Sequence, residues 1–136
     1  VRDIASKEQA NGEALIHDPS FQAKMTKLEI DIQALEMTEL RILSKLSNGQ
    51  NMGPESSLMK CRGTDLYQEV VALAFEAVGT YAIPFTPLRA GRNDEPIGAD
   101  YASGVAPRYY NARKVSIYGG SNEIQRNIMA KLILGL

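Results

Sequence analysis

The chain has 136 residues, of which 44% are hydrophobic, and this length suits one domain with its own core rather than two. Its 15 basic and 16 acidic residues are spread along the chain and leave a formal net charge of −1. Such a balance creates no field that would gather nucleic acid or an anionic membrane. We therefore expect a single domain over residues 1–136, with neither nucleic acid nor membrane as a partner.

Cysteine and histidine each occur once, as Cys61 and His17. One cysteine excludes an internal disulfide, and the two residues together give no Cys/His cluster for zinc. No apolar run approaches the roughly 20 residues that span a bilayer, and the N-terminus lacks the apolar core of a signal peptide. These features predict an intracellular protein without a bound metal. The first residue is Val1, so we expect the chain to be a piece of a longer one.

Two helices are expected in the first third of the chain. The first covers roughly Arg2 to Leu15 and is polar and weakly periodic. The second covers Phe21 to Leu46, where apolar residues recur at steps of three and four. Asp18-Pro19-Ser20 marks its start and Ser47-Asn48-Gly49 its end. A second apolar set widens its apolar face and predicts that the helix is covered on more than one side: Ile30, Met37, Leu40 and Leu43.

Two further helices follow, from Pro54 to Gly79 and from Asn122 to Leu134. Gly63, inside the first of them, is interpreted as a mark of close helix packing. The stretch between Ile83 and Ala106 is rich in proline, glycine and charge and is expected to be a functional loop or disordered. With strand signals absent, the pattern predicts an all-α fold, an up-and-down bundle of four main helices.

The stretch IYGGSNEIQRNI, Ile117 to Ile128, precedes and opens the last of these helices. Ser121 is placed to cap it, and Glu123 lies near the positive end of its dipole. The two preceding glycines give a bare backbone that another molecule can approach closely. The segment therefore fits a plain helix start and also an anion or nucleotide site at a helix N-terminus.

Three blocks of sequence carry a resemblance to a known family. They are FQAKMTKLEIDIQAL from Phe21, SLMKCRGTDLYQEVVALAFEAVG from Ser57, and the IYGGSNEIQR stretch with NARKVS before it and MAKLILG after it. The third is close to the family signature IYGGTNEIQR and is the most specific. On these blocks the chain resembles the C-terminal helical domain of the flavin-dependent acyl-CoA dehydrogenases.

The resemblance implies a longer enzyme that oxidises an acyl-CoA thioester, as in fatty acid β-oxidation, and passes the electrons to a separate acceptor. Its FAD is held between subunits that associate through their C-terminal domains, as a homo- or hetero-oligomer, a dimer or a tetramer. The implied location is the cytoplasm of a bacterium or the mitochondrial matrix of a eukaryote. The implied FAD contacts are Gly120, Ser121, Asn122 and Glu123, the turn Glu76, Ala77, Val78 and Gly79, and Gln22.

The chain departs from the family pattern at several positions. Glu76 stands where the family usually has Gln, and a carboxylate cannot donate the hydrogen bond that an amide gives. Thr80 replaces the second glycine of that turn. Gly119 stands where many members carry the glutamate that removes the α-proton, and glycine has no side chain to act as a base. In other branches that glutamate would fall upstream of Val1, so no catalytic residue is assigned within this chain.

Two functions remain open at this point. The first is the cofactor-facing, subunit-joining domain of an FAD-dependent acyl-CoA dehydrogenase, incapable of turnover alone. The second is a helical binding or interaction module, or a non-catalytic subunit, that keeps the fold without the chemistry.

Overall fold

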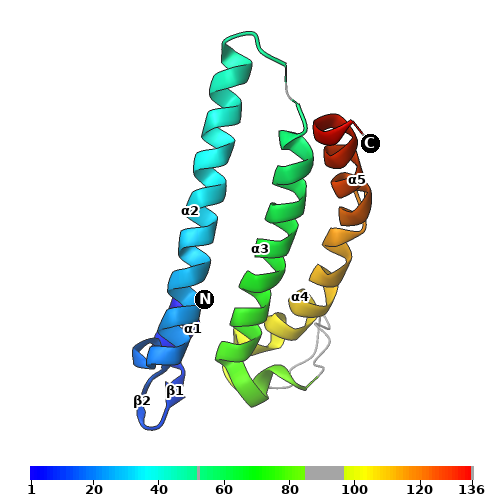
Figure 1. The fold of residues 1–136 in the computed structure, drawn as a ribbon. Coiled ribbons are helices and arrows are strands. Elements are labelled where there is room, and N and C mark those ends of the chain that lie inside the picture. Colours follow the sequence, from blue (N-terminus) through cyan, green and yellow to red (C-terminus); the bar gives the residue numbers. More distant parts are fainter. Residues whose placement is uncertain (52, 85–96, 136) are drawn as a thin grey trace. The chain divides into compact units, whose positions relative to one another are not determined.

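The computed structural model describes residues 1–136 except residues 52, 85–96 and 136. Helices dominate the part of the chain that it describes, and the all-α class is confirmed (Figure 1). None of the described helices is long and apolar enough to cross a membrane. The α-helices are α1 (Arg2–Lys7), α2 (Pro19–Ser47), α3 (Glu55–Val78), α4 (Val105–Ala112) and α5 (Asn122–Leu134). Short 3-10 turns cover Leu15–His17, Gly79–Ala82, Ala102–Gly104 and Arg113–Ser116.

The chain forms two compact units, and each is described by itself. Unit 1 comprises Val1–Thr26 and Gln68–Arg113, and unit 2 comprises Lys27–Tyr67 and Lys114–Leu136. Helices α2 and α3 therefore contribute residues to both units.

A small hairpin follows α1, and here the predicted helix from Arg2 to Leu15 is too long. The helix ends at Lys7, and strand β1 (Gln9–Ala10) pairs antiparallel with β2 (Glu13–Ala14). Asn11 and Gly12 form the connecting turn with φ of 54° and 85°. An Asn-Gly pair in this left-handed conformation matches the right-handed twist of two short strands. The expectation that the chain lacks strands is wrong at this point.

Helix α2 begins and ends close to where the sequence predicts. The Phe21 backbone N–H donates to Asp18 Oδ1 at 2.8 Å, which caps the first turn, and Gly49 follows the last turn with φ of 75°. Phe21 and Leu28 are buried, as expected. The second apolar set is exposed instead, for example Ile30 at 60% and Met37 at 54%. Within this chain, the expectation that this face is covered is wrong, so any cover would have to come from another molecule or segment.

Helix α4 is the main element that the sequence analysis missed. It begins at Val105, where a connecting loop was expected, and the 3-10 turn Ala102–Gly104 leads into it. Ala102 and Val105 belong to the buried core of unit 1 together with Val78 and Ala82. This end of the expected loop is therefore packed. Residues 85–96 of the expected loop lie outside the described residues.

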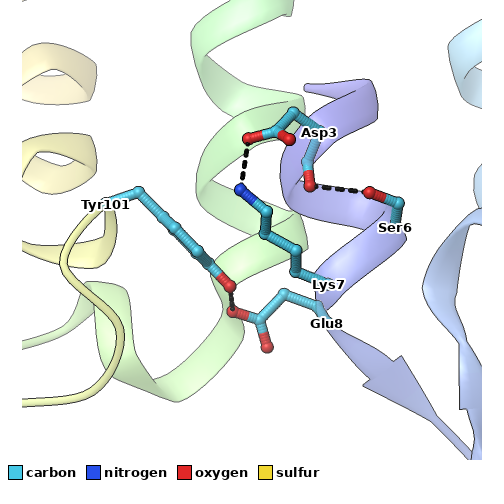
Figure 2. A network of polar contacts seen from close by, with 5 residues as sticks. All are labelled: Asp3, Ser6, Lys7, Glu8 and Tyr101. Atoms are coloured by element: carbon cyan, nitrogen blue, oxygen red, sulfur yellow. Dashed lines mark hydrogen bonds and ion pairs between the residues drawn. The ribbon is translucent and has the colours of Figure 1, made fainter.

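A polar network joins the segment before α4 to α1 within unit 1 (Figure 2). The Tyr101 hydroxyl donates to Glu8 Oε1 at 2.8 Å, and the Lys7 ammonium lies 5.6 Å from the centre of the Tyr101 ring. Lys7 also pairs with Asp3 at 2.8 Å. Burial of the phenol, and then its bond to Glu8, raise the pKa of Tyr101 above its ordinary value. Tyr101 therefore stays neutral and keeps the proton that it donates to Glu8.

Gly63 in the middle of α3 gives a direct test of helix packing in unit 2. A Cβ atom at this position would lie 3.9 Å from Leu35 Cδ2, an ordinary van der Waals distance. The close packing inferred from the sequence is therefore not needed here. We expect Gly63→Ala to raise the free energy of unfolding by about 0.5–1 kcal/mol, because alanine has less conformational entropy to lose in a helix.

The measurement is the midpoint of urea unfolding. Gly49→Ala is the control of opposite sign, since a side chain is strained at its φ of 75° and the same change should destabilise. A Gly63→Ala protein less stable than the parent would show that the helices approach more closely than this distance indicates.

Candidate functional site

The glycine turn before α5 has a backbone conformation that needs glycine. Gly119 and Gly120 have φ of 70° and 86°. At Gly120 a Cβ atom would also lie 2.6 Å from Gln125 Nε2. Both glycines therefore have a structural reason to be present. Their exposure leaves the bare backbone open to another molecule as well.

Ser121 and Glu123 form the start of α5 as the sequence predicts. Ser121 is the N-cap, and its Oγ accepts a hydrogen bond from the Ile124 backbone N–H at 3.4 Å. Glu123 is exposed, and the pKa of its carboxyl lies below the ordinary value. The main causes are hydrogen bonds from its own backbone N–H and then from the Ser121 hydroxyl. The helix start thus presents an ionised carboxylate, an acceptor of hydrogen bonds, beside the two glycines.

Asn122 lies between these exposed residues, but its side chain points into unit 2. It is only 4% exposed. Its Oδ1 accepts a hydrogen bond from Lys60 Nζ at 2.7 Å, and its Nδ2 donates to Asp65 Oδ1 at 3.2 Å and to Thr64 Oγ1 at 3.1 Å. An ammonium can only donate and a carboxylate can only accept, so these partners fix which way the amide faces. The side chain of Asn122 is therefore committed to contacts with α3.

Two further contacts join α3 to the same turn. Lys60 Nζ also donates to the Ser116 carbonyl oxygen at 3.3 Å. Ser57 Oγ donates to Gln125 Oε1 at 2.7 Å, and Gln125 Nε2 in turn donates to the Gly119 carbonyl oxygen at 3.2 Å. The turn is thus held from α3 at separate points.

The α3 residues that hold the turn were not predicted from the sequence. Their signal was present as polar residues at helical spacing within an otherwise mixed stretch, which places them on one face of α3. No local rule showed that this face meets α5. The residues are Ser57, Lys60, Thr64 and Asp65.

The second group of predicted contacts lies in unit 1. Gln22 and Glu76 are exposed, and Glu76 Oε1 pairs with Lys24 Nζ at 2.6 Å. Ala77 and Val78 are 5% and 3% exposed, so their side chains belong to the core. Gly79 is exposed with φ of 63° and ends α3. This group belongs to a different unit from the glycine turn, and the assignment of both groups to a cofactor stays a prediction.

The remaining reactive residues that the structure describes do not form a metal site. Among the described residues, no group of three or more His, Cys, Asp or Glu side chains is arranged to hold a metal ion. Cys61 is buried, and its Sγ lies 3.7 Å from the Asn122 carbonyl oxygen, which fits a packing role. His17 is exposed beside the start of α2.

Comparison with known proteins identifies the class of protein that this fold and turn define. Residues 1–134 match the family described as "Acyl-CoA dehydrogenase, C-terminal domain". The chain belongs to this family.

Individual relatives agree with the family. Acyl-CoA dehydrogenase FadE26 of Mycobacterium tuberculosis is 28% identical over 140 residues, which cover all of this chain and 33% of the relative. Among solved structures, the ChsE4-ChsE5 complex from Mycobacterium tuberculosis is 25% identical with a TM-score of 0.74, over 99% of this chain and 33% of that one. The FAD complex of PigA, at 19% identity and a TM-score of 0.75, covers 99% of this chain and 31% of that one and shows the same fold. The chain thus spans about a third of the length of these proteins.

The orientation of the Asn122 amide can be tested by exchanging the amide at position 122 with the carboxylate at position 65. Asn122→Asp removes the donor to Asp65 and sets two carboxylates against each other, which should lower the free energy of unfolding by about 1–3 kcal/mol. In the double variant Asn122→Asp with Asp65→Asn, an amide at position 65 can donate to a carboxylate at position 122. We expect this double variant to regain most of the lost stability.

A double-mutant cycle from urea unfolding measures the effect. The coupling free energy should exceed about 1 kcal/mol, well above the error expected for independent sites. Additive losses in the two single variants would contradict the hydrogen-bond assignment.

Proposed function

We propose that this chain is the C-terminal, cofactor-facing and oligomerisation domain of an FAD-dependent acyl-CoA dehydrogenase, incomplete for catalysis alone. The observation that carries the proposal is the glycine turn at α5, where Gly120 and Glu123 are exposed and Asn122 anchors the helix start. Family membership supports it, because the match runs through the chain to residue 134. The α,β-dehydrogenation of an acyl-CoA thioester is the proposed reaction of the longer protein.

The residues of the glycine turn suit the adenosine end of FAD. Exposed backbone without Cβ atoms allows close approach, and the ionised Glu123 carboxylate can accept hydrogen bonds from hydroxyl groups. Ser121 stabilises both the helix start and this carboxylate. We assign the contacts to Gly120, Ser121 and Glu123 directly and to Asn122 through its backbone, because the Asn122 side chain is buried.

In unit 1, a lysine lies beside the carboxylate that replaces the family amide. Glu76 cannot donate a hydrogen bond to a cofactor, but Lys24 Nζ lies 2.6 Å from its Oε1 and can. Ala77 and Val78 can contribute only backbone atoms, since both side chains are buried. We propose that Gln22, Lys24 and the Glu76–Gly79 turn together form the second cofactor contact, made to a neighbouring subunit.

The catalytic step needs a group that this chain does not supply at the expected position. A bound FAD would supply the acceptor for the hydride of the substrate β-carbon, and a carboxylate would have to remove the α-proton. Gly119 has no side chain for this role. We propose that the base is a glutamate on the helix that precedes Val1 in the longer protein. The residues present here would bind and orient the cofactor and join subunits.

A non-catalytic helical subunit or interaction module is the second candidate. The glycine at the family base position favours it, together with the exposed apolar residues of α2 and α5. Both candidates require partner chains, and a base upstream of Val1 distinguishes them.

The test of function uses both the isolated chain and the longest chain that the gene encodes. The isolated 136-residue chain should purify colourless and inactive with an acyl-CoA and an artificial electron acceptor, because losing most contacts to a ligand costs several factors of ten in affinity. The longest chain should be yellow and active. Replacing its upstream glutamate by glutamine should abolish turnover and leave the flavin bound.

The control for this test is the visible spectrum of the glutamine variant, which should match that of the unmodified protein. Normal turnover by the variant would disprove the assignment of the base. A longest chain that binds FAD but never turns over would favour the non-catalytic candidate.

Self-association is expected of the isolated chain. Exposed apolar residues are frequent on the unit 2 part of α2 and on α5. They include Leu40 at 51% and Leu132 at 65% exposure. Apolar surface of this kind is usually covered by another chain. Sedimentation at micromolar concentration should show a dimer or larger species, and Leu40→Lys with Leu43→Lys should shift it towards monomer. A parent that sediments only as monomer and binds no hydrophobic dye would contradict this.

A further inference from the structure

We infer that Lys60 is a positioning residue for the cofactor contact: it holds the glycine turn closed, and thereby keeps Gly120 and the start of α5 in the conformation that the nucleotide end of FAD would meet. The inference rests on the proposed function for its ligand. Its structural part, the holding of the turn, stands on the contacts of unit 2 alone.

Lys60 binds both ends of the turn. Its ammonium donates to the Ser116 carbonyl oxygen at 3.3 Å and to Asn122 Oδ1 at 2.7 Å. These two acceptors stand on either side of the turn of residues 117–121. One cation therefore ties the residue before the turn to the residue after it.

The two glycines make the turn costly to order, so it needs contacts that hold it. Adjacent glycines lose more conformational freedom on ordering than other residues, and fixing a backbone costs roughly 1–2 kcal/mol per residue. Apart from its chain neighbours, no atom lies within 4 Å of the place where a Cβ of Gly119 would be, so nothing packs against that side of the residue. Its ordering has to come from hydrogen bonds made at the ends of the turn and by its own carbonyl group.

A second contact to the turn begins on the same face of α3. Ser57, three residues before Lys60, binds Gln125, and Gln125 binds the Gly119 carbonyl oxygen. Helical spacing places Ser57 and Lys60 on one side of α3. Lys60 thus binds both ends of the turn directly, and Ser57 acts on its middle through Gln125 of α5.

The order of the turn before binding affects its affinity for a ligand. A site that is ordered before binding does not lose that entropy when the ligand arrives, so its affinity is higher. Removing the lysine leaves the buried Asn122 oxygen without its charged donor and removes the link that this ammonium makes between Ser116 and Asn122. The expected loss falls on FAD affinity and on the order of residues 117–123, while groups elsewhere on α3 are unaffected.

The experiment compares three variants of the longest chain that the gene encodes. Lys60→Met removes the ammonium and keeps the length of the side chain, and Lys60→Arg keeps donors to both acceptors. Lys45→Met is the matched control, since Lys45 also joins two helices of unit 2, through Glu55 at 2.8 Å, without touching the turn. For each variant we measure the FAD dissociation constant by flavin fluorescence and the amide hydrogen exchange of residues 117–123.

We expect Lys60→Met to raise the dissociation constant roughly tenfold, the factor for loss of one charge-assisted hydrogen bond, and to speed exchange across the turn. Lys60→Arg should recover most of both, and Lys45→Met should change neither. Should Lys60→Met fail to fold, Lys60→Gln, which also removes the ammonium, is measured in its place with the same two expectations.

Each outcome decides one part of the inference. If amide hydrogen exchange in the turn is no faster in Lys60→Met than in Lys45→Met, Lys60 does not hold the turn. Faster exchange with an unchanged dissociation constant overturns the link to the cofactor. If the unmodified protein binds no FAD, the proposed function fails and takes the cofactor link with it, while the exchange data still decide whether Lys60 holds the turn.

Discussion

The hydrogen bonding of one buried amide is the constraint on which unit 2 depends. Asn122 is 4% exposed, and a buried polar group left without partners costs about 1–3 kcal/mol. Its amide can be satisfied only while the first residue of α5 stays against Lys60 and Asp65 of α3. The glycine turn ends just before this residue, so its conformation depends on the same contacts. The candidate cofactor contact is therefore a product of how α5 is anchored.

Apolar residues at helical spacing in α2 mark both a face buried within this chain and a face that is exposed in it. Leu28 and Ile42 of α2 are buried within the chain, whereas Met37 and Leu40 lie half exposed on the same helix. Both sets recur at helical spacing, because the rule for a helix face is the same whether the neighbour belongs to the chain or to another molecule. The sequence can indicate that a face is buried, but it cannot indicate by which molecule.

Local signals explain what the sequence could predict, and distant contacts explain what it could not. Caps and a terminal glycine located both ends of α2 and the start of α5, since Asp18, Gly49 and Ser121 act on residues close to them in sequence. Helix α4 has eight residues and depends on a core shared with α3 and the turn after it, so its own pattern was too weak. The family motif located the glycine turn, but the bond from Lys60 to Asn122 joins residues 62 apart in the sequence. No spacing rule connects such residues.

The conformation of Gly119 bears on where a catalytic base can be. Its φ of 70° lies in the left-handed region, where a residue with a side chain is strained by about 1 kcal/mol or more. A glutamate at this position would therefore have to change the turn that Lys60 and Gln125 hold, or be held in strain by it. The residue type at position 119 is therefore coupled to the shape of the backbone. A base supplied from another helix, as proposed above, is compatible with this turn as it stands.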